Sequence, residues 1–202
     1  MENQDKKFWS LLLKLSLPIA LQHLLINSLT FVDTFFMSQL GDVALSASGM
    51  ASQCNWLLSM VSFGVCSGTA IFVSQLWGAE KIDEIKKTYA IAFLLSLFAA
   101  SLFFILSFFI PEKIMSIFNN DEMIVKYGSM YLRAVSFSYI PTVLNSVFST
   151  VLRSTEKVKL PMFVSLVTTS VNIVLDYALV FGAFSFPRMG ITGAAIATSI
   201  SA

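Results

Sequence analysis

Residues 18–33 read PIALQHLLINSLTFVD, a largely apolar run with a proline at one end and a carboxylate at the other. The run lies within a longer apolar segment, Leu11 to Leu40, which exceeds the ~20 residues that cross a bilayer as a helix. An ionisable side chain inside such a segment costs about 2.5–3.5 kcal/mol on insertion scales, so a functional role is the default expectation for it. Asp33 is therefore the first candidate functional residue.

The whole chain has the composition of an integral membrane protein. Of its 202 residues, 56% are hydrophobic and 12% are charged, whereas soluble domains carry about 25% charged residues. The basic residues are scattered in short clusters between apolar runs, so we expect no nucleic-acid partner. One histidine cannot build the usual metal cluster, and Cys54 and Cys66 would lie about 18 Å apart on one helix, beyond disulfide reach. A Gly-rich nucleotide-binding loop is absent from the sequence, and we expect neither an enzyme nor a cofactor.

Apolar runs separated by short polar segments predict an all-α, polytopic membrane protein with about six transmembrane helices, the sixth incomplete. After the first span, the expected spans are Gly49–Trp77, Thr88–Ile110, Met123–Leu152 and Leu160–Gly182, with the sixth beginning at Ile191. The expected loops between them are Glu80–Lys87, Glu112–Glu122, Arg153–Lys159 and Ala183–Gly190. The first of these loops has an alternative interpretation as one amphipathic turn at the interface. The small residues after Gly190 predict a tightly packed last helix.

The distribution of basic residues predicts the orientation. The N-terminus and the second and fourth loops together hold nine Lys and Arg, whereas the first, third and fifth loops hold three. Cytoplasmic loops are enriched in Lys and Arg. We therefore expect a multi-pass protein of the cell (cytoplasmic) membrane with a cytoplasmic N-terminus.

Two carboxylates fall inside spans that are expected to run in the same direction. Asp33 lies eight residues before Gly41 and Asp176 lies six residues before Gly182, so both should sit at a similar depth. Asn172 lies one turn before Asp176 on the same helix face. This arrangement predicts a cation or proton site, because oxygen ligands suit Na⁺ and a carboxylate can take up a proton. The alternative is that each Asp only hydrogen-bonds a neighbouring helix.

Three other polar or special residues in the spans have competing interpretations. Arg133 either snorkels to the headgroups or pairs structurally, or else it faces a cavity. His23 is expected to be a helix-packing residue. Pro18 either lies near the start of its helix, where its missing hydrogen bond costs little, or it kinks the helix and lets the outer part bend when Asp33 changes protonation.

Seven short motifs resemble those of the multidrug and toxic compound extrusion (MATE) transporters. They span nearly the whole chain in the right order, and together they are more specific than any one of them. They are Pro18, FVDTFF at 31–36, LGDVALSA at 40–47, VSQLWGA at 73–79, PM at 161–162, NIVLDY at 172–177 and MGITGAAIAT at 189–198.

The resemblance implies that residues 1–202 are the N-terminal lobe, cut in its sixth helix, of a two-lobed, twelve-helix antiporter. Such a protein would export cationic or amphipathic drugs as Na⁺ or H⁺ enters. Pro18 matches the proline at which the family's first helix is thought to bend. The positions that match the family's coupling residues are Asp33, Asn172, Asp176, Tyr131 and Thr198, of which the first three would be the Na⁺ ligands of a Na⁺-coupled protein.

The expected partners are the lipid bilayer, the exported drugs and a C-terminal lobe that is missing from this chain. Without that lobe, the chain alone is not expected to be a competent antiporter. Two alternatives stay open. One is a lipid-linked saccharide flippase of the same superfamily, which would need a more cationic cavity than Arg133 alone supplies, and the other is an inactive or structural membrane fragment.

Overall fold

The computed structural model describes residues 2–183 and 186–202, and the side chains of all of these except residues 2–8 and 11. Within this part of the chain every regular element is helical, which confirms the predicted all-α class. The elements are α1 (Glu2–Gln39), α2 (Asp42–Gly78), α3 (Ile82–Phe109), α4 (Pro111–Phe118), α5 (Glu122–Val135), the 3₁₀ turn η1 (Ser136–Ser138), α6 (Tyr139–Ser154), α7 (Lys159–Phe181) and α8 (Ile191–Ser201).

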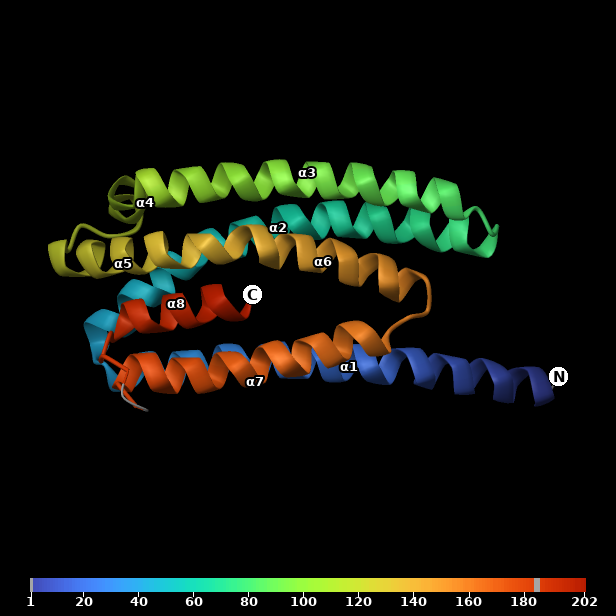
Figure 1. Ribbon diagram of the computed structural model, residues 1–202, viewed down its shortest axis with the longest axis horizontal. Helices are drawn as coiled ribbons and strands as arrows, with labels where there is room; N and C mark the ends of the chain where they lie inside the picture. The colour runs from blue at the N-terminus through green and yellow to red at the C-terminus, as the bar shows by residue number, and fades with distance from the viewer. Residues whose placement is uncertain (1, 184–185) are drawn as a thin grey trace.

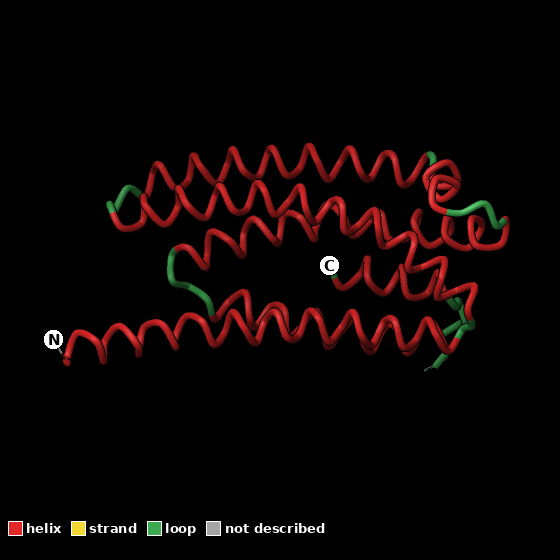
Figure 2. Tube along the Cα trace, turned by 180° about the vertical axis from the view of Figure 1, so that it is seen from behind, coloured by secondary structure: helices red, strands yellow, loops and turns green. Residues whose placement is uncertain are grey.

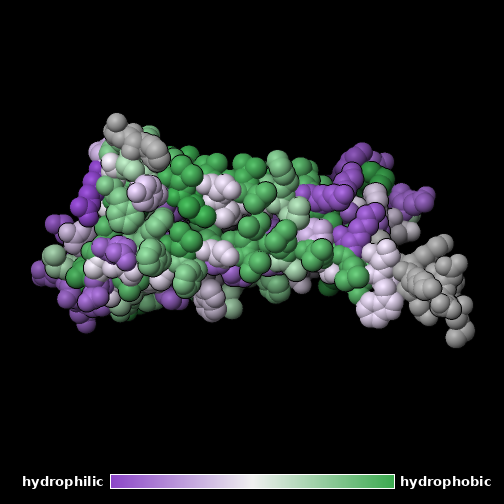
Figure 3. Space-filling model, turned by 90° about the horizontal axis from the view of Figure 1, so that it is seen from below, coloured by the Kyte–Doolittle hydropathy of each residue, from purple (hydrophilic) through white to green (hydrophobic). Residues whose placement is uncertain are grey.

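Five helical segments are long and apolar enough to cross a membrane, and α8 is apolar but shorter. They are Leu12–Gln39, Asp42–Gly78, Ile82–Phe109, Glu122–Ser154 and Lys159–Phe181. The helices run along the long axis of an elongated bundle (Figure 1). On the face shown in Figure 3, apolar side chains cover much of the middle and hydrophilic ones gather toward the two ends, as a lipid-facing surface requires. The predicted polytopic arrangement of about six helices is confirmed.

The helices extend further into the polar segments than the sequence predicted. Helix α3 begins at Ile82, so the expected loop Glu80–Lys87 ends at Lys81 and its remainder is helical, as the alternative of an amphipathic turn allowed. Lys86 Nζ pairs with Asp83 Oδ1 at 2.9 Å within the first turn of α3. The expected loop Glu112–Glu122 contains α4, which begins at Pro111, where the missing proline N–H costs nothing. Charged residues mark the ends of the spans here, because their long side chains reach the polar region from a helical turn.

The fourth predicted span is interrupted near its middle. Helix α5 ends at Val135, and the 3₁₀ turn Ser136–Ser138 joins it to α6. The Ser136 hydroxyl donates to the Arg133 carbonyl at 2.8 Å and the Ser138 hydroxyl donates to the Val135 carbonyl at 2.7 Å. Hydroxyl groups that bond the preceding turn in this way compete with the regular helix ladder and bend helices.

Helices α1 and α7 pair side by side, apart from a second layer formed by α2, α3, α5 and α6 (Figure 1). Helix α8 bridges the two layers by packing on both α7 and α5. A Cβ atom added at Gly193 would lie 2.7 Å from the Leu179 carbonyl carbon and oxygen, so glycine lets α8 approach α7 closely. The predicted tight packing of this small-residue helix is confirmed.

The turns at each end of the bundle differ in charge. The N-terminus, the α2–α3 turn and the α6–α7 connection lie at one end, and the α1–α2 turn and the start of α8 lie at the other (Figure 2). The three segments with most Lys and Arg are thus at the same end. This agrees with the charge argument for a cytoplasmic N-terminus, which itself stays a prediction.

Candidate cation site

Two polar contacts fix how α1 lies against α7. Gln22 Nε2 donates to Ser165 Oγ at 2.8 Å in a buried hydrogen bond. Eleven residues further along both helices, the side-chain carboxyl groups of Asp33 and Asp176 lie close enough to interact with each other. Eleven residues are about three helical turns, so both contacts fall on the same face of each helix. The two carboxylates therefore lie at the same depth, as the sequence predicted.

Asn172 connects this carboxyl pair to α8. Asn172 and Asp176 are both only 1% exposed. With the amide oriented so that both of its atoms are satisfied, Asn172 Nδ2 donates to Asp176 Oδ2 at 2.8 Å. The amide oxygen then accepts from the Thr198 backbone N–H at 3.3 Å and from the Ser201 hydroxyl at 3.0 Å. The position of Asp176 is thus coupled to that of α8.

Tyr131 and Thr198 also border the pair, but in different ways. Tyr131 on α5 is in hydrogen-bonding contact with Ser52 on α2 and is close enough to interact electrostatically with Asp33 and Asp176. The Thr198 hydroxyl donates to the Ala194 carbonyl of its own helix at 3.0 Å. Thr198 therefore contributes its backbone N–H to the site. The resemblance implied a role for Thr198 but did not say which of its groups acts.

The carboxyl pair has unused hydrogen-bonding capacity. Within the described residues, the buried Oδ1 atoms of Asp33 and Asp176 have no hydrogen-bond partner, although buried polar atoms are normally partnered. A hydrogen bond between two carboxyl groups needs one shared proton, and loss of that proton would leave two negative charges in contact. A cation between the two groups would relieve that repulsion, and carboxylate oxygens suit a hard cation. Asn172 would hold Asp176 in place, because its amide oxygen is already bonded to α8.

Arg133 lies away from this pair. Its Nη2 atom is 3.3 Å from Glu112 Oε1, and its Nε donates to the Phe108 carbonyl at 3.2 Å. These contacts tie α5 to the α3–α4 corner at the end of the bundle. Structural pairing, one of the two interpretations of Arg133, is confirmed.

A family comparison places this arrangement among known proteins. The family model described as MatE matches residues 18–178, which is most of the chain. The chain belongs to the MatE family. The family predicted from the motifs is thereby confirmed.

Two curated relatives of this MatE-family chain illustrate the range of their printed names. The chain is 29% identical, over 94% of its length, to the probable multidrug resistance protein NorM of Thermotoga maritima and covers 41% of that protein. It is 32% identical, over 94% of its length, to the FAD transporter of Shewanella oneidensis and covers 42% of it. The chain thus spans about two fifths of the length of the curated relatives it matches.

Solved structures of MATE transporters share the fold. The Vibrio cholerae transporter VcmN in its bent form has a TM-score of 0.85 and 23% identity, covering 95% of this chain and 43% of that one. A MOP superfamily transporter from Pyrococcus furiosus has a TM-score of 0.84 and 21% identity, covering 95% of this chain and 41% of that one. The fold seen here is therefore shared with about two fifths of each of these transporters.

Other expectations for this MatE-family chain need correction. Pro18 lies inside the single helix α1, which begins at Glu2, so the interpretation that places it near a helix start is wrong. His23 is exposed and lines a cavity, so it is not a packing residue. Ser52 and Ser201 were not predicted as residues of the site, because serines are frequent in this chain and residue type alone does not show which face of a helix they occupy.

Proposed function

We propose that this chain is one lobe of a cation-coupled antiporter that exports cationic or amphipathic drugs. In this proposal, Asp33, Asn172 and Asp176 form the coupling site. The observation that supports it is the contact between the Asp33 and Asp176 carboxyl groups across the α1–α7 interface. Such a pair holds one exchangeable cation, either a shared proton or a Na⁺ ion.

Occupancy of the pair would control the position of α1. With a proton or Na⁺ between the carboxyl groups, the second half of α1 is held against α7. Without it, the like charges repel, and α1 can move because Pro18 removes one backbone hydrogen bond from the helix upstream of Asp33. Asn172 holds Asp176 in place during this exchange, so the charge change is expressed on α1.

The second lobe belongs to the same proposal. The curated relatives and solved structures are more than twice as long as this chain, and an antiporter needs a cavity that opens alternately to the two sides. We expect a second lobe of similar size to complete that cavity. The N-terminus would lie in the cytoplasm, since the three most basic segments share its end of the bundle.

Ion binding by the purified chain tests the site directly. A cation that binds the folded state raises its thermal stability in proportion to RT ln(1 + [L]/Kd). In lipid nanodiscs, Na⁺ is expected to raise the unfolding temperature relative to choline at equal ionic strength, and Asp33→Asn is expected to remove this difference. Asp83→Asn is the matched control, because Asp83 is an exposed carboxylate paired with Lys86 in a distant turn.

H⁺ would be assigned as the coupling ion by two results together. The parent chain would show no response to Na⁺, and it would release a proton between acid and neutral pH that Asp33→Asn does not release. A chain that responds to neither ion would contradict the proposal and favour the inactive or structural fragment. In a transporter completed by a second lobe, Asp33→Asn is expected to abolish drug export at an unchanged protein level.

A further inference from the structure

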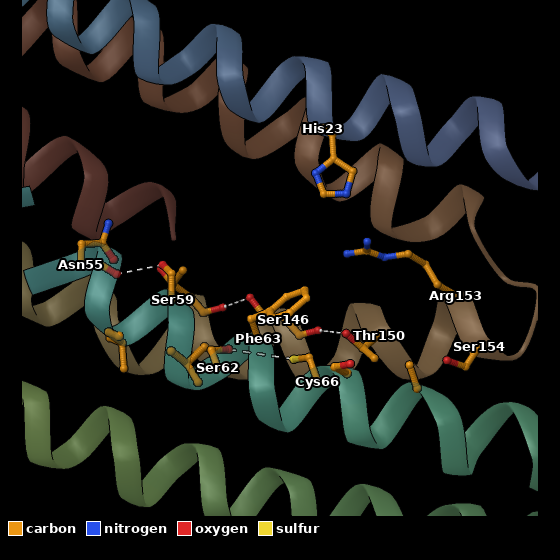
Figure 4. A pocket seen from close by; sticks show the side chains of 15 residues that line it. His23, Asn55, Ser59, Ser62, Phe63, Cys66, Ser146, Thr150, Arg153 and Ser154 are labelled. Atoms are coloured by element: carbon orange, nitrogen blue, oxygen red, sulfur yellow. Dashed lines mark hydrogen bonds between the residues drawn. The ribbon is translucent and has the colours of Figure 1, made fainter. Parts of the chain in front are cut away.

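A cavity of about 530 Å³ lies between α1, α2 and α6, nearer the N-terminal end of the bundle than the carboxyl pair. Its wall is rich in hydroxyl groups, which come from Ser59, Ser62, Ser67 and Ser154, together with three more on α6. Figure 4 shows His23 from α1 and Arg153 from α6 reaching into the same space. Among the described residues that line the cavity, none is acidic.

Arg153 is the unexplained group in this cavity. The sequence places it in a loop, but α6 continues to Ser154, so the guanidinium is carried by the last helical turn. Its Nε atom is buried without a hydrogen-bond partner in the described part of the protein. Arg133, by contrast, has Glu112 and a backbone carbonyl as partners. The residue as a whole is half-buried, and a buried N–H donor is costly unless an acceptor reaches it.

The chemistry of that acceptor follows from the donor geometry. A guanidinium presents a planar fork of N–H groups that fits the paired oxygens of a carboxylate or phosphate. The imidazole of His23 can donate one further hydrogen bond in either protonation state. Leu58, Phe63 and Val143 add apolar surface to the same cavity, which suits the hydrocarbon part of an amphipathic molecule.

We propose that this cavity binds the oxyanion, carboxylate or phosphate, of an amphipathic molecule, with Arg153 as its principal donor. His23 lies ten residues before Asp33 on α1, which places the oxyanion site about 15 Å along the helix from the carboxyl pair. The inference deepens the proposed function by naming a substrate class, since it adds anionic and zwitterionic amphiphiles to the cationic drugs. It rests on the transport proposal only for what happens after binding.

Binding to the purified chain in phosphatidylcholine nanodiscs tests the site. Octyl phosphate and octanoate are the probes, and octyltrimethylammonium is the control of opposite charge and similar length. We expect octyl phosphate to bind at least tenfold more tightly than the cation. Because hydrogen bonds to a charged group are the strong ones, we expect R153Q to weaken binding of octyl phosphate by about tenfold to a hundredfold. Equal affinity for the two charges, or an unchanged affinity in R153Q, would overturn the proposal.

R133Q is the matched control variant, because it also removes one arginine but acts outside the cavity, and it is expected to leave the affinity unchanged. Where R153Q loses its helical circular dichroism, R153K and H23A decide instead. R153K keeps the charge and loses the fork, so a weaker preference for octyl phosphate supports the proposal, and parent-like binding in both variants overturns it. D83N, which changes an exposed carboxylate in a distant turn, is expected to bind octyl phosphate normally. The Na⁺ response of thermal unfolding, measured on the same chains, separates failure of this site from failure of the coupling site.

The source of the oxyanion is read from competition. If the natural ligand is a lipid headgroup, nanodiscs that contain phosphatidic acid would weaken octyl phosphate binding in the parent chain. The weaker binding that remains in R153Q would not change. Inorganic phosphate that competes while the lipid does not would assign a soluble phosphate compound. If neither phosphatidic acid nor inorganic phosphate competes with octyl phosphate, and if R153Q binds octyl phosphate as the parent chain does, the cavity has no oxyanion site.

Discussion

Asp33 on α1 and Asp176 on α7 are 143 residues apart in the sequence, the same separation as the hydrogen-bonded pair Gln22 and Ser165. The equal separation means that α1 and α7 run parallel in one register from the first contact to the second. Pro18 precedes both contacts on α1. The contact between Asp33 and Asp176 joins two acidic groups, whereas the contact between Gln22 and Ser165 joins an amide to a hydroxyl. Only the contact between the two acidic groups therefore depends on a cation or proton.

The Na⁺ affinity of the site is expected to fall at acid pH. A proton and a Na⁺ ion would occupy the same carboxyl pair, so each competes with the other, and affinity should fall by up to about tenfold per pH unit for one displaced proton. Thermal stabilisation by Na⁺, measured from pH 5 to pH 9, checks this. A Na⁺ affinity that does not change over this pH range would mean that Na⁺ and the proton do not compete for the carboxyl pair, and that Na⁺ binds at another site.

Asn172→Leu is expected to lower both stability and cation affinity. The substitution removes the donor to Asp176 Oδ2 and the acceptor of the Thr198 N–H, and an unsatisfied buried polar group costs about 1–3 kcal/mol. Ser201→Ala is the milder control, because it removes one hydrogen bond and leaves Asp176 with its donor. Unfolding temperature and Na⁺ stabilisation measure the two effects. Equal losses in both variants would mean that Asn172 acts only through α8.

The parts of this protein that the sequence predicted are those that the bilayer dictates. Apolar runs longer than a membrane is thick must be helices, because unpaired backbone groups are too costly in lipid. The matched depth of Asp33 and Asp176 followed from helix direction and from distance to the ends of their spans. The helix pairing that brings the two groups into contact rests on the same geometry, which is why residues so distant in sequence could be predicted to share a site.

What the sequence did not predict depends on which face of a helix packs inward. The direction of Arg153 into a cavity and of Arg133 toward Glu112 is decided by the rotation of α5 and α6, and charge counts carry no information on rotation. The break at Ser136–Ser138 was not predicted because the apolar pattern continues through it, although serines that bond the preceding turn are known to bend helices.

Gly193→Ala is expected to destabilise the chain, since the added Cβ would meet the Leu179 backbone at 2.7 Å and force α8 away from α7. Overpacking of this kind costs typically about 1–3 kcal/mol. Gly68→Ala is the matched control, because a Cβ there meets nothing within 4 Å and alanine favours the helix by up to about 1 kcal/mol. Thermal unfolding in nanodiscs compares them, and a Gly193→Ala chain as stable as Gly68→Ala would mean that α8 can shift freely.

Pro18→Ala is expected to leave Na⁺ binding intact while removing the movement of α1 that binding controls. Alanine restores the backbone hydrogen bond that proline lacks and so stiffens the helix upstream of Asp33. Hydrogen–deuterium exchange of the second half of α1 measures this. In the parent chain, Na⁺ should slow exchange there, because the carboxyl pair holds α1 against α7. In Pro18→Ala, exchange should already be slow without Na⁺. The same Na⁺-dependent difference in both proteins would show that α1 moves as a rigid helix and that Pro18 is no hinge.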